Sequence, residues 1–331
     1  MKVPRINGYY VSPGTLLTDV KRSVQSRLKL YKRQPPINKV GNQHLLTTLE
    51  AHNEIANAIL TGNSFAAGRL GTVEGDLLSW RIRYPNRPFP LGLLMNSKRL
   101  AGVYPANQKG AGDFVDCYLE AVENLDLLGV RNNDFFSGYF KMERTVVEKT
   151  RLRALCSIEA LSPMGEPESW VKALAGKKVL VIHPFATTIR NQYLQNISRI
   201  YPGKSWLPDF KLEVFTPSQT AGDELPLGEP SSWNRALEVM LREVSKINFD
   251  VALIAAGAYG LPLASEIKKS GKVAIHVGGM LQLFFGIRGG RFDTISSQYE
   301  YLSLYHTEAW VRPTKEETPT WNRQVEGGAY W

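Results

Sequence analysis

Residues 249–279 read FDVALIAAGAYGLPLASEIKKSGKVAIHVGG. Two short apolar runs, 251–256 and 272–277, enclose a segment at 262–270 whose apolar residues recur at helical spacing. Strands of a parallel sheet read as continuous apolar runs because helices cover both of their faces. The stretch therefore predicts a strand–helix–strand unit with a glycine-containing turn after each strand, at 257–260 and 278–279.

The same alternation extends upstream. Apolar runs at 178–183 and 212–216 predict strands, and periodic segments at 188–200 and 233–247 predict helices. The first half is less regular; we expect strands at 65–68 and 135–140 and helices at 45–61, 77–82, 110–128 and 143–160. Strands that alternate with helices of this length predict an α/β fold, an open and mostly parallel sheet with helices on both faces.

Composition places the chain among ordinary globular proteins, since 43% of its 331 residues are hydrophobic and 21% are charged. No apolar run reaches the roughly 18 residues that a membrane-spanning helix needs, and the first residues lack the apolar core of a signal peptide. Cys117 and Cys156 have the spacing of neither a metal site nor a disulfide framework. We therefore expect two thiols in a reducing cytoplasm.

The formal charge of +9 is concentrated at one end of the chain. Residues 1–40 contain nine Lys or Arg and one acid, which leaves a net charge of about +1 on residues 41–331. A body this neutral argues against nucleic acid as a partner. We expect a basic arm at 1–40 and a single α/β catalytic domain at 41–331, with the aromatic C-terminal tail docked on it.

Residues 12–33 of the arm combine helical apolar spacing with Lys and Arg on the opposite face. Such a helix could bind an anionic membrane surface, which would place the protein at the inner face of the cell membrane. It could equally pack on its own domain and expose its basic face to water. The sequence leaves both interpretations open.

Ligands of an open parallel sheet bind at the carboxyl ends of its strands, which selects candidate site residues before any motif is considered. After the strand at 65–68 come Arg69, Gly71, Glu74 and Asp76. Arg69 could neutralise a diphosphate. Glu74 and Asp76 could bind a hard divalent cation, or one of them could act as a general base. Acids enriched in the first turn of a helix are the alternative explanation.

His183 and His276 each end an apolar strand. A single histidine in such a place is usually a hydrogen-bonded structural residue, but two at the same edge of one sheet also fit a functional site. After the strand at 251–256, the loop with Gly257, Tyr259 and Gly260 precedes a helix, whose free N–H groups could bind a phosphate. This loop is equally consistent with a tight strand–helix turn.

The segment after the last strand, GGMLQLFFGIRGGRFD, mixes polar and large apolar residues with paired glycines. Such a segment could wrap a nucleotide or a sugar, or it could be a structural loop. Its candidate donor-binding residues are Gly278, Gly279, Gln282, Arg288 and Arg291.

Two stretches, FAAGRLGTVEGD at 65–76 and the one at 249–279, together resemble the GT-D glycosyltransferases. In that family a strand leads into Arg-Phe-Gly-Asp-Gly-Glu, and a later strand ends in Ala-Ile-Asp-Ile-Gly-His. Arg69 and Glu74 match this pattern, whereas Thr72 and His276 stand at the two Asp positions. The resemblance implies a Rossmann-like nucleotide-binding core and a UDP-sugar donor. It also implies Mn²⁺ or Mg²⁺ on an Asp-x-Glu motif, which Thr72 puts in doubt unless Asp76 substitutes.

Other stretches look like uncharacterised proteins encoded with capsule and lipopolysaccharide genes. These stretches are GKKVLVIHPF (176–185), GAYGLPLA (257–264), AIHVGGMLQLFFGIRGGRFD (274–293) and VEGGAYW (325–331). This likeness spans about residues 45–331 and implies a role in surface-polysaccharide biosynthesis.

We therefore expect a hexosyl or pentosyl transferase that moves a sugar from a nucleotide-sugar onto a glycan or lipid-linked glycan. Glu74, Asp76 and His276 are its candidate catalytic residues. Two alternatives are a nucleotide-dependent sugar-modifying enzyme and a non-catalytic scaffold of a glycan-assembly complex. The first is disfavoured because no dinucleotide-binding fingerprint is present.

Overall fold

The structure is a computed structural model of the 331-residue chain. It describes residues 37–131, 137–150, 153–164, 169–203, 207–222, 225, 228–293, 295–296 and 302–331, together with the backbone of 5–6 and 9–10. The helix expected at 12–33 lies outside the described residues.

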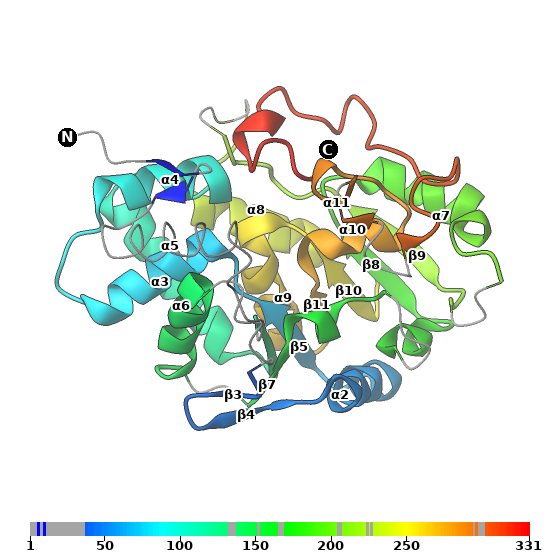
Figure 1. Ribbon diagram of the computed structural model, residues 1–331, viewed down its shortest axis with the longest axis horizontal. Helices are drawn as coiled ribbons and strands as arrows, with labels where there is room; N and C mark the ends of the chain where they lie inside the picture. The colour runs from blue at the N-terminus through cyan, green and yellow to red at the C-terminus, as the bar shows by residue number, and fades with distance from the viewer. Residues whose placement is uncertain are drawn as a thin grey trace, which may run out of the picture.

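A nine-stranded sheet forms the centre of the molecule, in the order β3-β4-β7-β6-β5-β11-β10-β8-β9 (Figure 1). Every neighbouring pair is parallel except β3 and β4, which form an antiparallel edge. The predicted open, mostly parallel α/β sheet is therefore confirmed. Its strands are β3 (Lys39–Val40), β4 (Gln43–Leu46), β5 (Phe65–Arg69), β6 (Leu127–Val130), β7 (Ala154–Ser157), β8 (Lys178–Ile182), β9 (Lys211–Phe215), β10 (Val251–Ile254) and β11 (Val273–His276).

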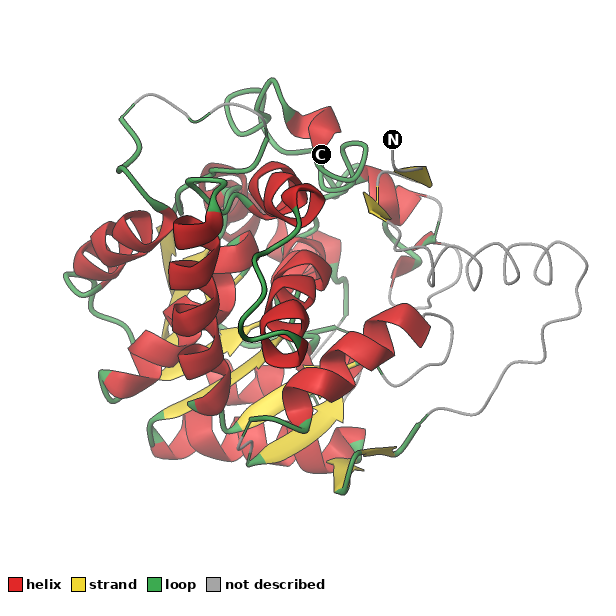
Figure 2. Ribbon diagram, turned by 90° about the vertical axis from the view of Figure 1, so that its left-hand side faces the viewer, coloured by secondary structure: helices red, strands yellow, loops and turns green. Residues whose placement is uncertain are grey.

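Helices cover both faces of this sheet (Figure 2), and each face has its own apolar core. One face carries α3 (Thr72–Arg83), α4 (Leu91–Ala101), α5 (Gln108–Glu123), α6 (Ser137–Val147), α8 (Trp233–Val244) and α9 (Gly260–Lys269). The other carries α2 (Thr48–Thr61), α7 (Ala186–Ile200), α10 (Leu281–Phe284), α11 (Gly290–Asp293) and the 3₁₀ turns η2 (Ile158–Leu161) and η3 (Trp170–Leu174). Burial of both faces explains why the strand sequences are continuously apolar.

Local sequence signals set several helix ends. Thr47 and Glu50 form a reciprocal capping box at the start of α2, and Gly62 ends that helix with a left-handed φ of 71°. The side chain of Ser232 accepts a hydrogen bond from the Arg235 N–H at the start of α8. These are signals that the sequence displays directly.

Three sequence-based expectations in the first half are wrong. The helix expected at 110–128 ends at Glu123, and Leu127–Val130 form the strand β6. Residues 137–140, expected in a strand, form the first turn of α6, and the helix expected at 143–160 ends at Val147. The strand β7 follows it and lies between β4 and β6. Its apolar run is only four residues long and continues the helical spacing of α6, so periodicity could not separate the two elements.

Among the described helices, none combines the length and the apolarity needed to cross a bilayer. A two-stranded hairpin, β1 (Arg5–Ile6) with β2 (Tyr9–Tyr10), lies outside the main sheet.

Asp126 ties the amino end of β5 to neighbouring elements. Its carboxylate accepts a hydrogen bond from the Ala66 N–H at 3.0 Å and forms ion pairs with Lys268 at 2.8 Å and Arg153 at 2.9 Å. The Asp126 side chain is 9% exposed, and the Lys268 side chain is 12% exposed, so this ion pair is largely buried.

We expect Asp126→Ala to lower the free energy of unfolding by roughly 3–5 kcal/mol, because it leaves the buried Lys268 ammonium without its counter-ion and the Ala66 N–H without its acceptor. Urea denaturation would measure the change. Arg153→Ala is the matched control: its side chain is 76% exposed, so its loss should cost less than about 1 kcal/mol. Equal losses in the two variants would contradict this account.

Candidate functional site

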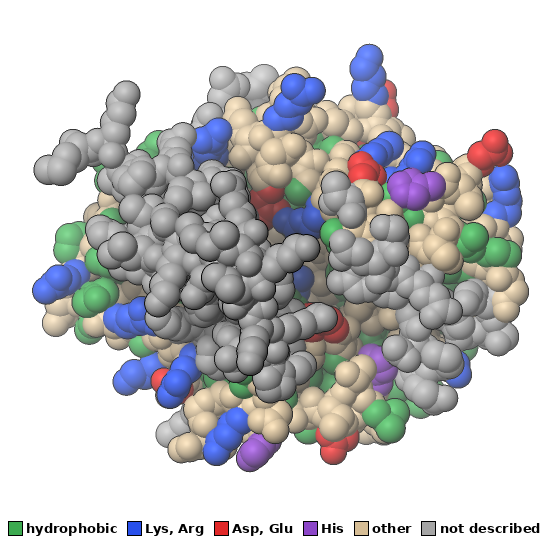
Figure 3. Space-filling view, in the orientation of Figure 1, with side chains coloured by type: hydrophobic (Ala, Val, Ile, Leu, Met, Phe, Trp, Pro, Cys, Tyr) green, Lys and Arg blue, Asp and Glu red, His purple; other side chains and the backbone are tan. Residues whose placement is uncertain are grey.

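Strands β5 and β11 are neighbours in the middle of the sheet, and the connections that follow their carboxyl ends depart to opposite faces. The chain leaves β5 into α3 on one face, whereas it leaves β11 through the 3₁₀ turn η5 (Gly278–Met280) into α10 on the other. In open α/β sheets a crevice forms where adjacent connections part in this way, and ligands bind there. On the face drawn in Figure 3, acidic and basic side chains lie together in a recessed area near the centre of the view, beside the α10–α11 region.

Arg69, the last residue of β5, lies in this crevice without a direct partner. No hydrogen bond or ion pair engages its guanidinium within the part of the chain that the structure describes. Burial lowers the pKa of Arg69, the nearby cations Arg131 and Arg291 lower it further, and Tyr330 and Glu143 oppose them. An arginine has five N–H donors, and a half-buried guanidinium whose donors form no hydrogen bonds raises the free energy of the folded state. The arrangement suits an anionic ligand.

Glu74 contributes a buried carboxylate to the same place. It is the third residue of α3, and its side chain folds back over the start of the helix, where it accepts a hydrogen bond from its own N–H. A Cβ on Gly71 would lie 2.0 Å from Glu74 Oε2, so a side chain there would displace the carboxylate. Burial raises the pKa of Glu74. The hydrogen bond from its own N–H and the charges of Arg69 and Arg131 lower the pKa, but they do not cancel the effect of burial. The position of the Glu74 carboxylate therefore requires glycine at position 71.

Arg131 and Glu143 belong to the site and were not identified from the sequence. Arg131 follows β6, and its guanidinium pairs with Glu143 Oε1 on α6 at 2.5 Å, while its N–H donates to Oε2 at 2.8 Å. The Glu143 side chain is only 1% exposed, and burial raises its pKa. The strand-end rule that selected Arg69 also applies to Arg131, but the sequence assigned the start of β6 to a helix.

Asp76 lies apart from the Arg69 cluster. Because α3 already begins at Thr72, Glu74 and Asp76 are both helical and point about 160° apart around the axis. Asp76 is exposed at the surface, yet the protein around its carboxyl displaces enough water to raise its pKa to about 6. The Glu74 carboxylate adds to this rise and Arg83 opposes it.

The described side chains do not form a cation site at this position. Glu74 and Asp76 do not share a face of α3, and Thr72 offers no carboxylate. No group of three or more His, Cys, Asp or Glu suited to a metal ion is found in the described ranges. Glu74 instead faces two arginine side chains, Arg69 and Arg131. Binding of Mn²⁺ or Mg²⁺ by Glu74 and Asp76 therefore has no support in this arrangement.

The two strand-end histidines are buried in different surroundings. Burial lowers the pKa of each to about 3, so both rings are neutral at physiological pH. His183 Nδ1 accepts a hydrogen bond from the Phe185 N–H at 2.9 Å, two strands away from β11. His276 lies beside Arg69, its Nδ1 is 3.3 Å from the Ile254 carbonyl, and its ring leaves no room for a Cβ on Gly260.

The N-terminus of α7, which follows His183, already holds a carboxylate of this chain. Glu317 Oε1 accepts hydrogen bonds from the N–H groups of Thr187 at 2.8 Å and Thr188 at 3.2 Å. A helix N-terminus favours an anion, and Glu317 supplies it. His183 is therefore not brought into the Arg69 cluster.

The loop after β10 points partly away from the crevice. Tyr259 stacks on Trp233 in the core, with ring centroids 4.7 Å apart, and its hydroxyl lies 2.9 Å from Thr220 Oγ1. Gly257 has a left-handed φ of 54° and open space around it. Tyr259 is thus placed as a core residue.

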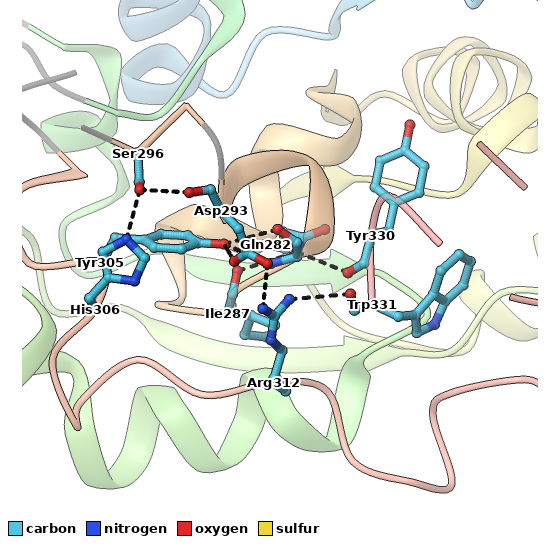
Figure 4. Close-up of polar contacts among 10 residues, drawn as sticks. Gln282, Ile287, Asp293, Ser296, Tyr305, His306, Arg312, Tyr330 and Trp331 are labelled. Carbon is cyan, nitrogen blue, oxygen red and sulfur yellow. Dashed lines mark hydrogen bonds and ion pairs between the residues drawn. The ribbon is translucent and has the colours of Figure 1, made fainter. Parts of the chain in front are cut away.

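The segment after β11 comes together with the C-terminal tail. Gln282 is fully buried and donates to the carbonyls of Ile287 at 3.3 Å and Tyr330 at 3.2 Å (Figure 4). The Arg288 N–H donates to the Val311 carbonyl at 2.7 Å, and Arg291 forms an ion pair with Glu326. Gln282 and Arg288 thus connect parts of the protein to each other.

The chain is similar to one family model and to several solved structures. Residues 230–284, from α8 to α10, match a family model described as a GT-D fold-like domain. This range includes the whole of the stretch at 249–279, one of the two that resemble GT-D enzymes, and excludes the other, at 65–76. No curated protein matches the chain.

Solved structures of domain of unknown function 1792 are similar to this chain at low identity. One, titled as a selenomethionine-substituted form of the domain, has 12% identity and a TM-score of 0.45, covering 86% of this chain and 94% of the other. A second, described as having a distinct glycosyltransferase fold, has 13% identity, a TM-score of 0.44 and the same coverage. A third, described as a new glycosyltransferase from Streptococcus sanguinis, has 9% identity, a TM-score of 0.44 and coverage of 87% and 100%.

Proposed function

We propose that this chain is a glycosyltransferase of the hexosyl or pentosyl class, with a nucleotide-sugar of the UDP-sugar type as its donor. One observation carries the proposal: the Arg69 guanidinium, between β5 and β11, has no hydrogen-bond or ion-pair partner among the residues that the structure describes. A planar guanidinium matches the paired oxygens of a phosphate and donates two parallel hydrogen bonds to them.

The proposed chemistry needs stabilisation of a leaving diphosphate. The acceptor hydroxyl oxygen forms a bond to the anomeric carbon as the bond from that carbon to the phosphate oxygen breaks. The electron pair of the broken bond leaves with the nucleoside diphosphate. Arg69 faces this developing charge, and Arg131 adds a second positive charge nearby. Fixed cations in a site with little water stabilise such charge strongly.

Glu74 is the proposed acceptor of the proton that the attacking hydroxyl loses. Burial raises its pKa, which makes the carboxylate a stronger base. It interacts with both Arg69 and Arg131, whereas Asp76 interacts with Glu74 and Arg83. The ring nitrogen of His276 that faces the Ile254 carbonyl is unavailable for this role. On this basis we prefer Glu74 to Asp76 or His276 as the proposed base.

The acceptor is proposed to be a glycan or lipid-linked glycan of a surface polysaccharide, such as capsule or lipopolysaccharide. The support is the sequence likeness of residues 45–331 to proteins encoded with such genes. Binding of residues 12–33 to the inner face of the membrane remains part of this proposal, and so does a cytoplasmic location.

Isothermal titration calorimetry with UDP, GDP, CMP, NAD and S-adenosylmethionine tests the proposal, each in EDTA and again with Mn²⁺. We expect UDP to bind at least about tenfold more tightly than NAD, and to bind in EDTA because the arginines supply the positive charge. Binding of NAD or S-adenosylmethionine alone would instead favour a sugar-modifying enzyme. No binding by any nucleotide would favour the scaffold.

A further inference from the structure

Two side chains from opposite ends of the chain flank the dipeptide Gly278-Gly279. A Cβ on Gly278 would lie 3.4 Å from Arg69 Cδ, and a Cβ on Gly279 would lie 2.5 Å from Tyr330 Cε1. Arg69 and Tyr330 therefore lie against adjacent residues of the loop after β11. Consistent with this closeness, Tyr330 is among the groups that act on the charge of Arg69.

The hydroxyl of Tyr330 is unused. It forms no hydrogen bond within the described part of the chain, and Figure 4 shows it directed away from the polar contacts of the C-terminal tail. The residue is half-buried. A phenol hydroxyl near a guanidinium that has no partner among the described residues provides one more donor for the same anion.

The tail holds this ring in place by contacts that spare the hydroxyl. Gln282 donates to the Tyr330 carbonyl at 3.2 Å, and the Arg291 N–H donates to the Ala329 carbonyl at 2.9 Å. The Arg291 guanidinium lies over the Tyr330 ring, 4.8 Å from its centroid. A ring fixed in this way loses little freedom when a ligand binds.

We propose that Tyr330 is a donor-binding residue, whose hydroxyl donates a hydrogen bond to a phosphate oxygen of the sugar nucleotide held by Arg69. The inference rests on the proposed function and adds to it a residue from the last turn of the tail. It also explains why position 279 is a glycine, because any side chain there would displace the Tyr330 ring.

Tyr330→Phe removes only the hydroxyl and keeps the ring between Gly279 and Arg291. A hydrogen bond to a charged group contributes about 1.5–3 kcal/mol, so the Kd for UDP should rise by roughly 10- to 100-fold. Calorimetry with UDP as the probe measures it. Tyr84→Phe is the control, because Tyr84 is 40% exposed at the far end of α3; its Kd should be unchanged.

Gly279→Ala provides a second, independent variant. The added methyl group should displace the Tyr330 ring and weaken UDP binding as much as Tyr330→Phe does. In the double variant the two losses should not add, because both remove the same hydrogen bond. Circular dichroism and thermal melting would verify that each variant folds.

The possible outcomes distinguish a failure of this inference from a failure of the proposed function. If the wild-type protein binds UDP and folded Tyr330→Phe binds it equally well, Tyr330 is not a donor ligand, and the proposed function stands. If the wild-type protein binds no nucleoside diphosphate, both proposals fail.

Discussion

Replacing Arg69 with methionine should abolish most nucleotide binding and leave the protein as stable as before, or more stable. The guanidinium has no hydrogen bond or ion pair among the described residues, and burial with Arg131 nearby lowers its pKa, so the fold carries a cost for keeping it charged. An apolar side chain of similar length removes that cost. A bidentate contact to phosphate is lost at the same time.

We expect the Kd for UDP to rise by roughly 100-fold or more in Arg69→Met, while the midpoint of thermal unfolding stays level or increases. Calorimetry and thermal melting measure the two quantities. Arg69→Lys should recover part of the binding, since it restores a charge without the planar fork. Arg242→Met, at an exposed position of α8, is the control and should change neither quantity. A fall in stability with unchanged binding would show that Arg69 is structural.

Glu74→Gln should reduce the rate of sugar transfer by about 10²- to 10⁴-fold, the range expected when a general base is lost. The amide has nearly the same shape, so UDP binding should change much less than the rate. Transfer from UDP-sugars under saturating donor would measure kcat. A kcat equal to that of the wild-type protein would exclude Glu74 as the base.

The same substitution should change how stability depends on pH. Because burial raises the pKa of Glu74 above its usual 4.5, folding favours the protonated acid. This contribution is complete below the unfolded pKa and is lost as pH rises through the folded pKa. The Gln variant cannot ionise, so it should be more stable than wild type at neutral pH, with a difference that shrinks in acid. Urea denaturation across this pH range tests the sign.

Asp76→Asn distinguishes the two acids of α3. Its pKa of about 6 means that the stability linked to protonated Asp76 is lost between roughly pH 4 and 6. The Asn variant should therefore also gain stability toward neutral pH, by an amount reduced by solvent at this exposed position. Its kcat should remain within about tenfold of the wild-type value, because Asp76 lies outside the Arg69 cluster. A larger loss than in Glu74→Gln would move the base to Asp76.

Much of the candidate site follows from one rule applied to the sequence. Arg69 and His276 were selected because they end apolar strands, and β5 and β11 do lie side by side with both residues at the same edge. Gly71 was selected with Glu74. In the structure the Glu74 carboxylate occupies the space that a side chain at position 71 would need. His183 and Tyr259 were selected by the same rule, but His183 accepts a hydrogen bond from the Phe185 N–H and Tyr259 stacks on Trp233 in the core.

Other members of the site could not be read from the sequence. Glu143 lies 12 residues beyond Arg131 and forms its ion pair only because α6 returns over the sheet. Tyr330 lies 261 positions after Arg69, and no local pattern relates them. Pairings of this kind depend on which surfaces meet after the helices pack.

The sequence by itself predicted five strands of the main sheet (β5 and β8 to β11), most of the helices and the edge of the sheet at which a ligand is proposed to bind, because these depend on local periodicity and on glycine and capping residues near in the chain. Only the tertiary structure decided the order of the strands and the faces to which their loops depart. It thereby decided that Arg131 pairs with Glu143 while Arg69 has no partner among the described residues, and that Tyr330 lies near Arg69. The physical reason is that burial and charge act through space, whereas periodicity acts along the chain.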